Sequence, residues 1–425
     1  MNLSVVTSGI ALLHLLGLLA AMHAVMHART PQGAIGWTLG LLLLPYVTLL
    51  PYLYLGSSRF LGYRIGHQAS LPRSPPTSSA DAHPVDPQCV RFAAIGALQG
   101  RPFRGGHRLR LLIDGTAAFD AMLEAMAAAE HVLLVQFFII HDDGLGRRLQ
   151  QLLLQRAAAG VQVCVLFDGI GSHALPSRYV ETLRAGGVAI HRFATHRWRN
   201  RFQLNFRNHR KIVVVDGERA FVGGLNVGDE YLGLKPPLSP WRDTHLELRG
   251  PAVADLQQLF ADDWQWITGT RPVLQAAPPA DGHASALIVA CGPADPQETG
   301  SLFFTAAIHA ARERVWLSTP YFVPDHAVRA GIRVFRYQPG FLHQKALLID
   351  RDCAAIGSMN LDSRSFRLNF EVGALVVDPA FANDVATMLE ADFSHAVAID
   401  EREYRDAPYL RRVAMHVARL FDPLL

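Results

Sequence analysis

The chain has little lysine and little cysteine. Only three of its 40 basic residues are lysines, and the remainder are arginines. Its four cysteines include no closely spaced pair, so neither a disulfide framework nor a cysteine-based zinc site is expected. The net charge of +3 is too small to suggest binding of nucleic acid through bulk charge. Apolar residues, in contrast, make up half of the chain, which points toward a membrane.

Two uncharged stretches, residues 3–26 and 35–55, lie close to the N-terminus. Each approaches the ~20 residues that a helix needs to cross a bilayer, so they predict a two-helix transmembrane hairpin within residues 1–60. Pro45 and Pro51 are expected to kink the second helix, which membrane helices tolerate. A cleaved signal peptide is disfavoured, because a second apolar stretch follows the first.

Beyond the hairpin, a linker precedes two larger segments. Residues 61–89 are rich in proline and serine and are expected to form a loose linker. Residues 90–275 and 283–425 each alternate helical segments with short apolar strands, the pattern of an α/β sandwich domain. The last residues, 409–425, have the pattern of a basic amphipathic helix that could lie at a membrane surface or pack on the domain.

An internal repeat relates the two segments. Five residues recur at one offset of 134 positions: His209, Lys211, Asp216, Gly223 and Asn226 correspond to His343, Lys345, Asp350, Gly357 and Asn360. Five matches at a single offset indicate a duplication, and two of the three lysines belong to it. Two copies of half a site predict one complete site where the halves meet.

Each copy of the repeat has the pattern of a strand, a turn and a returning strand. His209 and Lys211 alternate along the first strand and therefore lie on the same face. The returning strand brings glycines and an asparagine back beside them, and glycine allows a substrate to approach the backbone closely. The predicted substrate-binding residues are Gly223, Gly224 and Asn226 in the first copy, and Gly357, Ser358 and Asn360 in the second.

The aspartates of the repeat are far along their strands from the histidines. Asp216 lies five residues beyond Lys211, roughly 16 Å at ~3.3 Å per residue, and Asp350 is placed equivalently. From this spacing we interpret both aspartates as residues that either fix a turn or support the catalytic side chains from behind. Other carboxylates must orient the histidines, and the candidates are Asp243 and Glu371.

Two histidines, two lysines and two asparagines suit chemistry at a phosphodiester. Lysine and asparagine donors bind the phosphate oxygens, while one imidazole attacks phosphorus and the other protonates the leaving oxygen. Lysine carries a compact charge and arginine a planar fork, so a narrow slot would keep lysine even in a chain that otherwise uses arginine.

The duplicated H-x-K-x4-D pattern, followed by G-[GS]-x-N, resembles the phospholipase D superfamily. The segments "QFFIIHDDGLG", "WRDTHLELRGPAV" and "YQPGFLHQK", with the N-terminal hairpin, are similar to bacterial cardiolipin synthases over nearly the whole chain. The resemblance implies two pseudo-symmetric phospholipase D-type α-β-α sandwich domains. It also implies a catalytic set made of His209, Lys211, Asp216, His343, Lys345 and Asp350.

The same resemblance implies a reaction and a location. One phosphatidylglycerol would transfer its phosphatidyl group to another, giving cardiolipin and glycerol through a phosphatidyl-histidine, without a cofactor or an essential metal. We assign His209 as nucleophile and His343 as general acid and base, although the symmetry of the repeat makes the two roles exchangeable. The expected partners are phosphatidylglycerol and membrane phospholipid, not nucleic acid, and the expected location is the bacterial inner membrane, as a multi-pass protein. Basic residues around the hairpin favour a cytoplasmic catalytic region: Arg59, Arg64 and Arg73 follow it, against Arg29 in its turn.

Several alternatives share part of this interpretation. A hydrolytic phospholipase D, or a transferase that uses phosphatidylethanolamine or another alcohol, would use the same intermediate. A nuclease of the superfamily would not need the hairpin and would carry a basic stripe. A catalytically silent membrane scaffold would keep the fold without turnover. The sequence leaves the oligomeric state open.

The second half departs from the first in length. Val132 precedes His209 by 77 residues, whereas Val315 precedes His343 by only 28. The segment "GLGRRLQQLLLQRAAAGVQVCVLFDGIGS", a predicted helix, strand and loop, has no counterpart, and the loss falls between about residues 326 and 330. A sheet without one inner strand must close the gap or expose an apolar edge, so a weakened or altered second domain is predicted.

Overall fold

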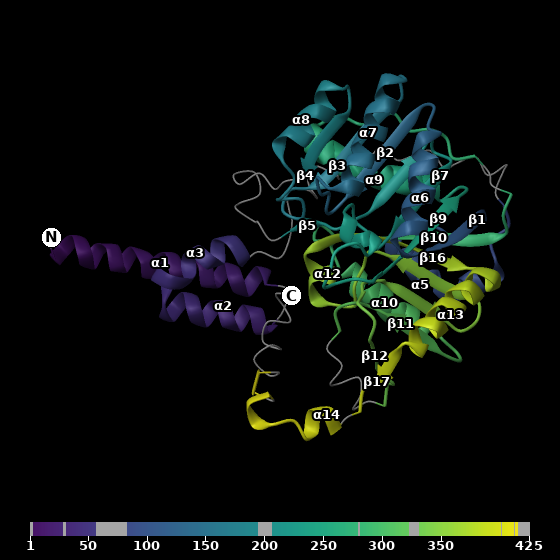
Figure 1. Cartoon of the computed structure of the whole chain (residues 1–425). Coiled ribbons are helices and arrows are strands. Elements are labelled where there is room, and N and C mark those ends of the chain that lie inside the picture. The colour runs from purple at the N-terminus through teal and green to yellow at the C-terminus, as the bar shows by residue number, and fades with distance from the viewer. Residues whose placement is uncertain are drawn as a thin grey trace. The chain divides into compact units, whose positions relative to one another are not determined.

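A computed structural model describes residues 3–28, 31–56, 83–193, 206–278, 281–322, 331–400, 402–411 and 413–414. They form two compact units, a smaller one that contains the N-terminal helices and a larger one that contains all of the described strands (Figure 1). Most of the predicted linker, the arginines after the hairpin and most of the predicted C-terminal helix lie outside the described residues.

The N-terminal helices agree only in part with the predicted hairpin. Helix α1 (Leu3–His27) is unbroken, and its residues Val5–His27 are long and apolar enough to cross a membrane. The second apolar stretch forms two shorter helices, α2 (Pro31–Leu43) and α3 (Pro45–Leu55), instead of one kinked helix. The break falls at Leu44, because the residue before a proline avoids helical geometry and Pro45 has no N–H to donate.

Small residues allow these helices to pack closely. Ala21 and Ala24 of α1 are buried against Leu41 of α2, whose side chain is completely buried. A Cβ atom on Gly17 would lie only 2.5 Å from the carbonyl oxygen of Leu41. Because apolar helices in lipid associate through close packing, this seam is suited to a membrane.

The larger unit is built on a 13-stranded sheet, with strands in the order β11-β14-β15-β16-β10-β1-β9-β7-β6-β2-β3-β4 and β5 paired to β16. The first half supplies β1 (Arg104–Ile113), β2 (Val132–Phe137), β3 (Gln162–Asp168), β4 (Ala189–Phe193), β5 (Arg207–Asn208), β6 (Ile212–Val215), β7 (Arg219–Gly223) and β9 (Thr244–Arg249). The second half supplies β10 (Ala284–Cys291), β11 (Val315–Ser318), β14 (Ala346–Ile349), β15 (Cys353–Gly357) and β16 (Asn369–Val377). The halves join where β1 pairs with β10, so the order on one side repeats in reverse on the other.

Helices cover both faces of this sheet and make three layers. Helices α9 (Val253–Thr268) and α13 (Pro379–Ser394) share one core with side chains of both halves. The opposite face of the first half is covered by α6 (Asp114–Ala127), α7 (Gly144–Ala158) and α8 (Ser177–Ala185). In the second half that face is covered by η2 (Pro87–Phe92), α5 (Ala93–Gln99) and α10 (Thr299–His309). The predicted α-β-α arrangement is confirmed, while the domain limits at residues 275 and 283 stay a prediction.

The second half contains no described counterpart of α7 and β3. In the first half β2 lies between β6 and β3, and all six of its residues are buried. Its counterpart β11 pairs only with β14 among the described strands, and all four of its residues are half-buried. Leu133 pairs with Val215, and Val315 pairs with Ile349, which is the repeat equivalent of Val215. Val315 therefore corresponds to Leu133, one residue later than the Val132 used in the sequence comparison. The missing inner strand therefore leaves β11 at the edge of the sheet.

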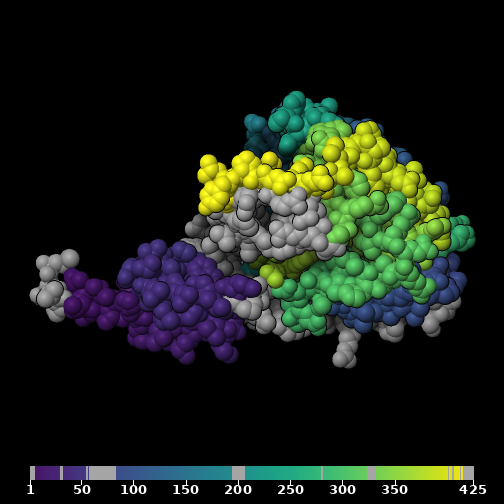
Figure 2. Space-filling model, turned by 90° about the horizontal axis from the view of Figure 1, so that it is seen from below, coloured from purple at the N-terminus to yellow at the C-terminus, as the bar shows by residue number. Residues whose placement is uncertain are grey.

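The strand that follows the shortened region leaves the main sheet. In the first half β4 is the outermost strand and pairs with β3. Its counterpart β12 (Phe335–Tyr337) pairs instead with β17 (Ala396–Ala398) in a separate two-stranded sheet. Phe335 and Val397 of this small sheet are exposed. Residues of the second half, in green and yellow, form much of the face of the larger unit seen in Figure 2.

Restoring the missing unit is expected to stabilise the second half. Insertion of a helix, strand and loop copied from residues 144–172 between residues 326 and 330 would pair the free edge of β11 and bury its side chains. We expect a higher thermal midpoint with a sharper transition, measured by calorimetry beside the natural chain. An unchanged midpoint and cooperativity in a folded insertion variant would contradict the prediction.

Candidate active site

The two His-x-Lys segments begin by pairing with the opposite half. His209 follows β5, which pairs in parallel with β16, and its N–H donates to the carbonyl of Phe370 at 2.9 Å. His343 follows β13 (Phe341–Leu342), which pairs in parallel with β8 (Trp241–Arg242), and its N–H donates to the carbonyl of Arg242 at 2.8 Å. Backbone pairing thus places His209 beside Phe370, the residue before Glu371, and His343 beside Arg242, the residue before Asp243.

Each imidazole is held by a carboxylate from the opposite half. Nδ1 of His209 lies 2.8 Å from Oε2 of Glu371, and Nδ1 of His343 lies 2.7 Å from Oδ2 of Asp243. Both carboxylates are completely buried. Because Nδ1 donates to the carboxylate, the lone pair of Nε2 is available to act as a nucleophile or as a base. These are the two carboxylates that the sequence nominated, although the spacing did not show that they cross between halves.

The two lysines lie beside the histidines and differ in their contacts. Nζ of Lys211 donates to the carbonyl of His209 at 2.7 Å and lies 5.4 Å from the ring centroid of Phe138. Nζ of Lys345 contacts the carbonyl of His343 and lies 2.8 Å from Nδ1 and 3.1 Å from Nε2 of that imidazole. Lys211 has no exposed surface, and Lys345 is 4% exposed.

Burial and the shared positive charge keep both imidazoles neutral. Burial lowers the pKa of His209 to about 4, and the ammonium groups of Lys211 and Lys345 act in the same direction. Burial also lowers the pKa of His343 to about 3, with Lys345 and Lys211 contributing. Since each histidine responds to the lysines of both halves, the two motifs share one electrostatic site.

The same environment holds the carboxylates ionised and perturbs the lysines. Burial alone would raise the pKa of Glu371, but His209, Lys211 and the Ser358 hydroxyl outweigh it and lower the pKa. Burial lowers the pKa of Lys345 to about 8, although nearby carboxylates oppose the change. Burial likewise lowers the pKa of Lys211 well below its usual value. Perturbed groups collected in this way are typical of a functional site.

The predicted glycines make room for neighbouring protein groups. A Cβ atom on Gly224 would lie 2.1 Å from Oδ1 of Asp243, and one on Gly223 would lie 2.5 Å from Nδ1 of His245. A Cβ atom on Gly357 would lie 2.6 Å from Cα of Gly373. Close approach of the carboxylate and of adjacent strands therefore requires these glycines, and contact with a substrate stays a prediction.

The residues that follow the glycines are tied into the framework. Ser358 donates its hydroxyl to Oε2 of Glu371 at 2.6 Å and so supports this carboxylate. At the equivalent position of the first half, Gly224 leaves room for Asp243, whose side chain is one methylene shorter. Asn226 accepts from the Ile139 N–H and donates to the Tyr231 hydroxyl. Asn360 is buried, and its Oδ1 has no hydrogen-bond partner among the described residues.

Asp216 and Asp350 lie at the turns beyond the far ends of β6 and β14 and adopt positive φ angles of 49° and 54°. The Asp216 carboxylate accepts from the N–H groups of residues 130–132, and Asp350 accepts from those of residues 312–314. Asp350 also pairs with Arg91 at 2.7 Å. These contacts agree with the turn-fixing interpretation, and the place of both aspartates in the catalytic set that the resemblance implies stays a prediction.

Sequence reasoning missed two buried arginine–aspartate pairs beneath the site. Arg210 binds Asp263 of α9 at 2.9 Å and donates to the carbonyl of Glu371. Arg242 binds Asp392 of α13 at 2.7 Å and donates to the carbonyl of Asp243. Each pair anchors the backbone of a carboxylate that orients a histidine. A usable signal was the charged Arg210 within a strand pattern, together with an aspartate late in the long helix that follows each repeat, α9 and α13.

Aromatic side chains surround the two histidines unequally. The ring of His209 meets Phe138 edge-on, with centroids 4.9 Å apart. The ring of His343 lies 5.2 Å from Trp241 and 5.7 Å from Phe341. In the described part of the chain, no three or more His, Cys, Asp or Glu side chains are grouped as a metal site. The arrangement supplies two neutral nucleophilic nitrogens, two ammonium groups and a largely dry environment.

Comparison with known proteins identifies the family. Residues 122–264 and 325–395 match the family "Cardiolipin synthase, PLD-like domain". The chain is 50% identical to cardiolipin synthase A of Pseudomonas aeruginosa, over 97% of this chain and 95% of that protein. It is also 50% identical to cardiolipin synthase A of Pseudomonas fluorescens, over 98% of both chains. The chain belongs to the cardiolipin synthase family. As a member it is a phosphatidyltransferase with phospholipase D-like halves.

The comparisons also bear on the fold and on the shortened half. The crystal structure of phosphatidylserine synthase from Haemophilus influenzae covers 79% of this chain with a TM-score of 0.57 at 13% identity, which shows a shared fold. The alignment with the Pseudomonas aeruginosa enzyme spans 464 positions, more than the 425 residues of the chain, so that relative holds residues that are missing here. The second family match is also much shorter than the first.

Substitution of Asp350 tests its structural role. In the Asp350→Ala variant, the backbone N–H groups of residues 312–314 and Arg91 lose their acceptor, and we expect a loss of about 1–3 kcal/mol in unfolding free energy. Asp350→Asn should lose less, because asparagine tolerates positive φ and keeps one acceptor oxygen. Denaturant unfolding gives the stability. A hundredfold fall in kcat at unchanged stability would instead place Asp350 in the chemistry.

The lowered pKa of Lys345 predicts an alkaline limit to phosphatidyl transfer. We expect kcat/KM to fall as pH rises through about 8, because deprotonated Lys345 no longer attracts a phosphodiester anion. Lys235 is a matched control: burial lowers its pKa, but ion pairs with Asp143 and Glu230 outweigh burial and raise the pKa to about 12. Lys235→Met should keep the same alkaline limit. A profile that stays flat up to the range of ordinary lysines would contradict this assignment.

Proposed function

We propose that the chain joins two phosphatidylglycerol molecules into cardiolipin and releases glycerol. The relatives at 50% identity are named cardiolipin synthase A, and the chain covers 95% or more of each of them. One observation carries the proposal for the residues: each histidine is oriented by a buried carboxylate of the opposite half, around two buried lysines.

The first step forms a covalent intermediate on His209. Lys211, Lys345 and the two motif asparagines bind the phosphate oxygens of the first phosphatidylglycerol. Nε2 of His209 attacks phosphorus, and the bond between phosphorus and the headgroup glycerol oxygen breaks. His343 gives a proton to that oxygen, so glycerol leaves as a neutral alcohol.

The second step returns the enzyme to its starting state. The headgroup hydroxyl of a second phosphatidylglycerol loses its proton to His343 and attacks phosphorus. The bond between phosphorus and Nε2 of His209 breaks, and cardiolipin is released. The phosphodiester anion favours the imidazolium form of His343 when substrate is bound, because a nearby negative charge raises the pKa of a histidine.

The contacts of the two rings support this assignment of roles. Among the described residues, Nε2 of His209 accepts no hydrogen bond, so its lone pair can reach phosphorus. Nε2 of His343 lies 3.1 Å from the ammonium of Lys345, which would compete with a nucleophilic role. Glu371, with help from Ser358, would orient the nucleophile, and Asp243 would orient the acid and base.

A membrane location follows from the substrate and the first helix. The apolar helix α1 would anchor the chain in the bacterial inner membrane, and α2 and α3 would pack beside it. The excess of arginines after the hairpin favours a cytoplasmic catalytic region. The phosphodiester site would then act on headgroups of the cytoplasmic leaflet.

Lipid analysis tests the reaction. Expression in a host that lacks cardiolipin should produce cardiolipin, and purified enzyme should release glycerol from phosphatidylglycerol. Phosphatidic acid as the main product would indicate hydrolysis, and a different diester would indicate another acceptor alcohol. Absence of both turnover and a phosphatidyl-enzyme would indicate a silent scaffold. His209→Ala and His343→Ala should each reduce transfer to background.

The same two variants separate the roles of the histidines. A phosphatidyl ester of p-nitrophenol needs no acid to expel its leaving group. His343→Ala should therefore release one equivalent of p-nitrophenol and accumulate phosphatidyl-enzyme, whereas His209→Ala should release none. The reverse result would exchange the two roles.

A further inference from the structure

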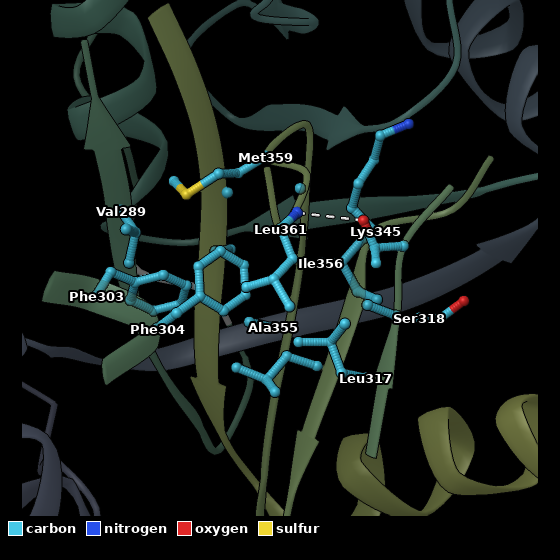
Figure 3. Close-up of a pocket in the computed structure, with 16 residues that line it drawn as sticks. Val289, Phe303, Phe304, Leu317, Ser318, Lys345, Ala355, Ile356, Met359 and Leu361 are labelled. Atoms are coloured by element: carbon cyan, nitrogen blue, oxygen red, sulfur yellow. Dashed lines mark hydrogen bonds between the residues drawn. The ribbon is translucent and has the colours of Figure 1, made fainter. Parts of the chain in front are cut away.

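An apolar slot lies in the second half between α10 and the edge of the sheet (Figure 3). Its walls come mostly from aliphatic and aromatic side chains, among them Val289, Phe303, Phe304, Leu317, Met359 and Leu361. Lys345 stands at one end, and Figure 3 shows its side chain leading away from the apolar lining.

The equivalent space in the first half is filled. Leu317, Leu347, Met359 and Leu361 correspond by strand pairing and repeat offset to Val135, Val213, Leu225 and Val227. All four first-half residues are at most 1% exposed. They belong to one core cluster with Leu145 and Leu149 of α7 and with Phe119 and Met122 of α6, so both helices contribute to filling this space.

Two differences between the halves open the slot. First, the second half has no described counterpart of α7, and its edge strand β11 is half-buried where β2 is buried. Second, Ala355 lines the slot where the repeat offset places Phe221, a completely buried ring of the first-half core. The absence of a helix over β11 leaves the slot open, and Ala355 leaves it without the aromatic ring present in the first half.

The position of the slot limits what can occupy it. Lys345 forms one end of the slot, and its ammonium lies 2.8 Å from the His343 imidazole, so slot and active site share one side chain. A ligand that fills the slot and engages the site must combine an apolar chain with an anionic head. Glycerophospholipids have this structure, with acyl chains a few bonds from the phosphate. An apolar slot buries the methylenes of such a chain at a gain of ~0.8 kcal/mol each.

We propose that the slot binds an acyl chain of the phospholipid whose phosphate is held at Lys345. The proposal rests on the transfer reaction proposed above and adds a site that discriminates acyl chains. The absence of a described counterpart of α7 thereby gives the second half a lipid-binding surface. The ammonium end retains the phosphate, while the far end, beside Phe303 and Phe304, receives the chain.

The test uses phosphatidylglycerols that differ only in acyl length and are short enough to remain monomeric. For the natural enzyme, kcat/KM should rise about fourfold per added methylene over the length of the slot. Ala355→Phe places the first-half ring in the slot, and Leu317→Trp blocks it from the edge strand. Both variants should turn over the shortest substrate at the natural rate and lose the dependence on chain length.

A control variant and a labelling experiment complete the test. Leu302 lies on α10, is 40% exposed and does not line the slot, so Leu302→Phe adds an aromatic ring elsewhere and should keep the natural dependence. A phosphatidylglycerol with a diazirine at the acyl end should label peptides of α10 and β11 in the natural enzyme, but not in Ala355→Phe. Equal length dependence in all variants, or labelling only at other peptides, would contradict the proposal that the slot binds an acyl chain. Failure of the natural enzyme to form cardiolipin would instead overturn the proposed function.

Discussion

The site depends on the exchange of carboxylates between the two halves. Glu371 of the second half holds the histidine of the first, and Asp243 of the first half holds the histidine of the second. A buried carboxylate is costly unless it is paired, so neither half is complete without the other. The arginine–aspartate pairs below the site, Arg210–Asp263 and Arg242–Asp392, fix the backbone that carries these carboxylates. The pairing of the two halves therefore also assembles the active site.

Burial explains the composition of the site. Two ammonium groups close together in a dry environment repel each other and weaken the protonation of both imidazoles, so the histidines stay neutral until an anion arrives. A phosphodiester supplies that negative charge and relieves the repulsion. Lysine suits this task because a compact ammonium fits beside an imidazole, as Lys345 does beside His343. The third lysine, Lys235, lies at the surface in ordinary ion pairs.

The shortened second half shows that the two copies serve the site unequally. The His-x-Lys motifs and their asparagines flank the hairpins β6–β7 and β14–β15, whose register survives in both copies. The missing helix and strand belong to the outer part of the sheet, so their loss leaves the hairpin of the site intact and exposes β11. Relatives such as the Pseudomonas enzymes hold additional residues, which indicates that the shorter form is a departure within the family.

The sequence alone determined the duplication, the α/β class and the turns at Asp216 and Asp350, because strand alternation and a fixed offset are local properties. It placed each His-x-Lys motif on a strand, whereas both motifs lie between two short strands, β5 and β6 in the first half and β13 and β14 in the second. It also predicted that the second half lacks a helix and a strand, and the described residues contain no counterpart of α7 and β3. Only the tertiary structure decided which carboxylate serves which histidine, since β5 and β13 cross to the other half through long-range pairing. It also decided that the glycines admit Asp243 and His245, and that Pro45 divides the second apolar stretch into two helices. Those outcomes depend on distances between segments far apart in the chain, which no local pattern contains.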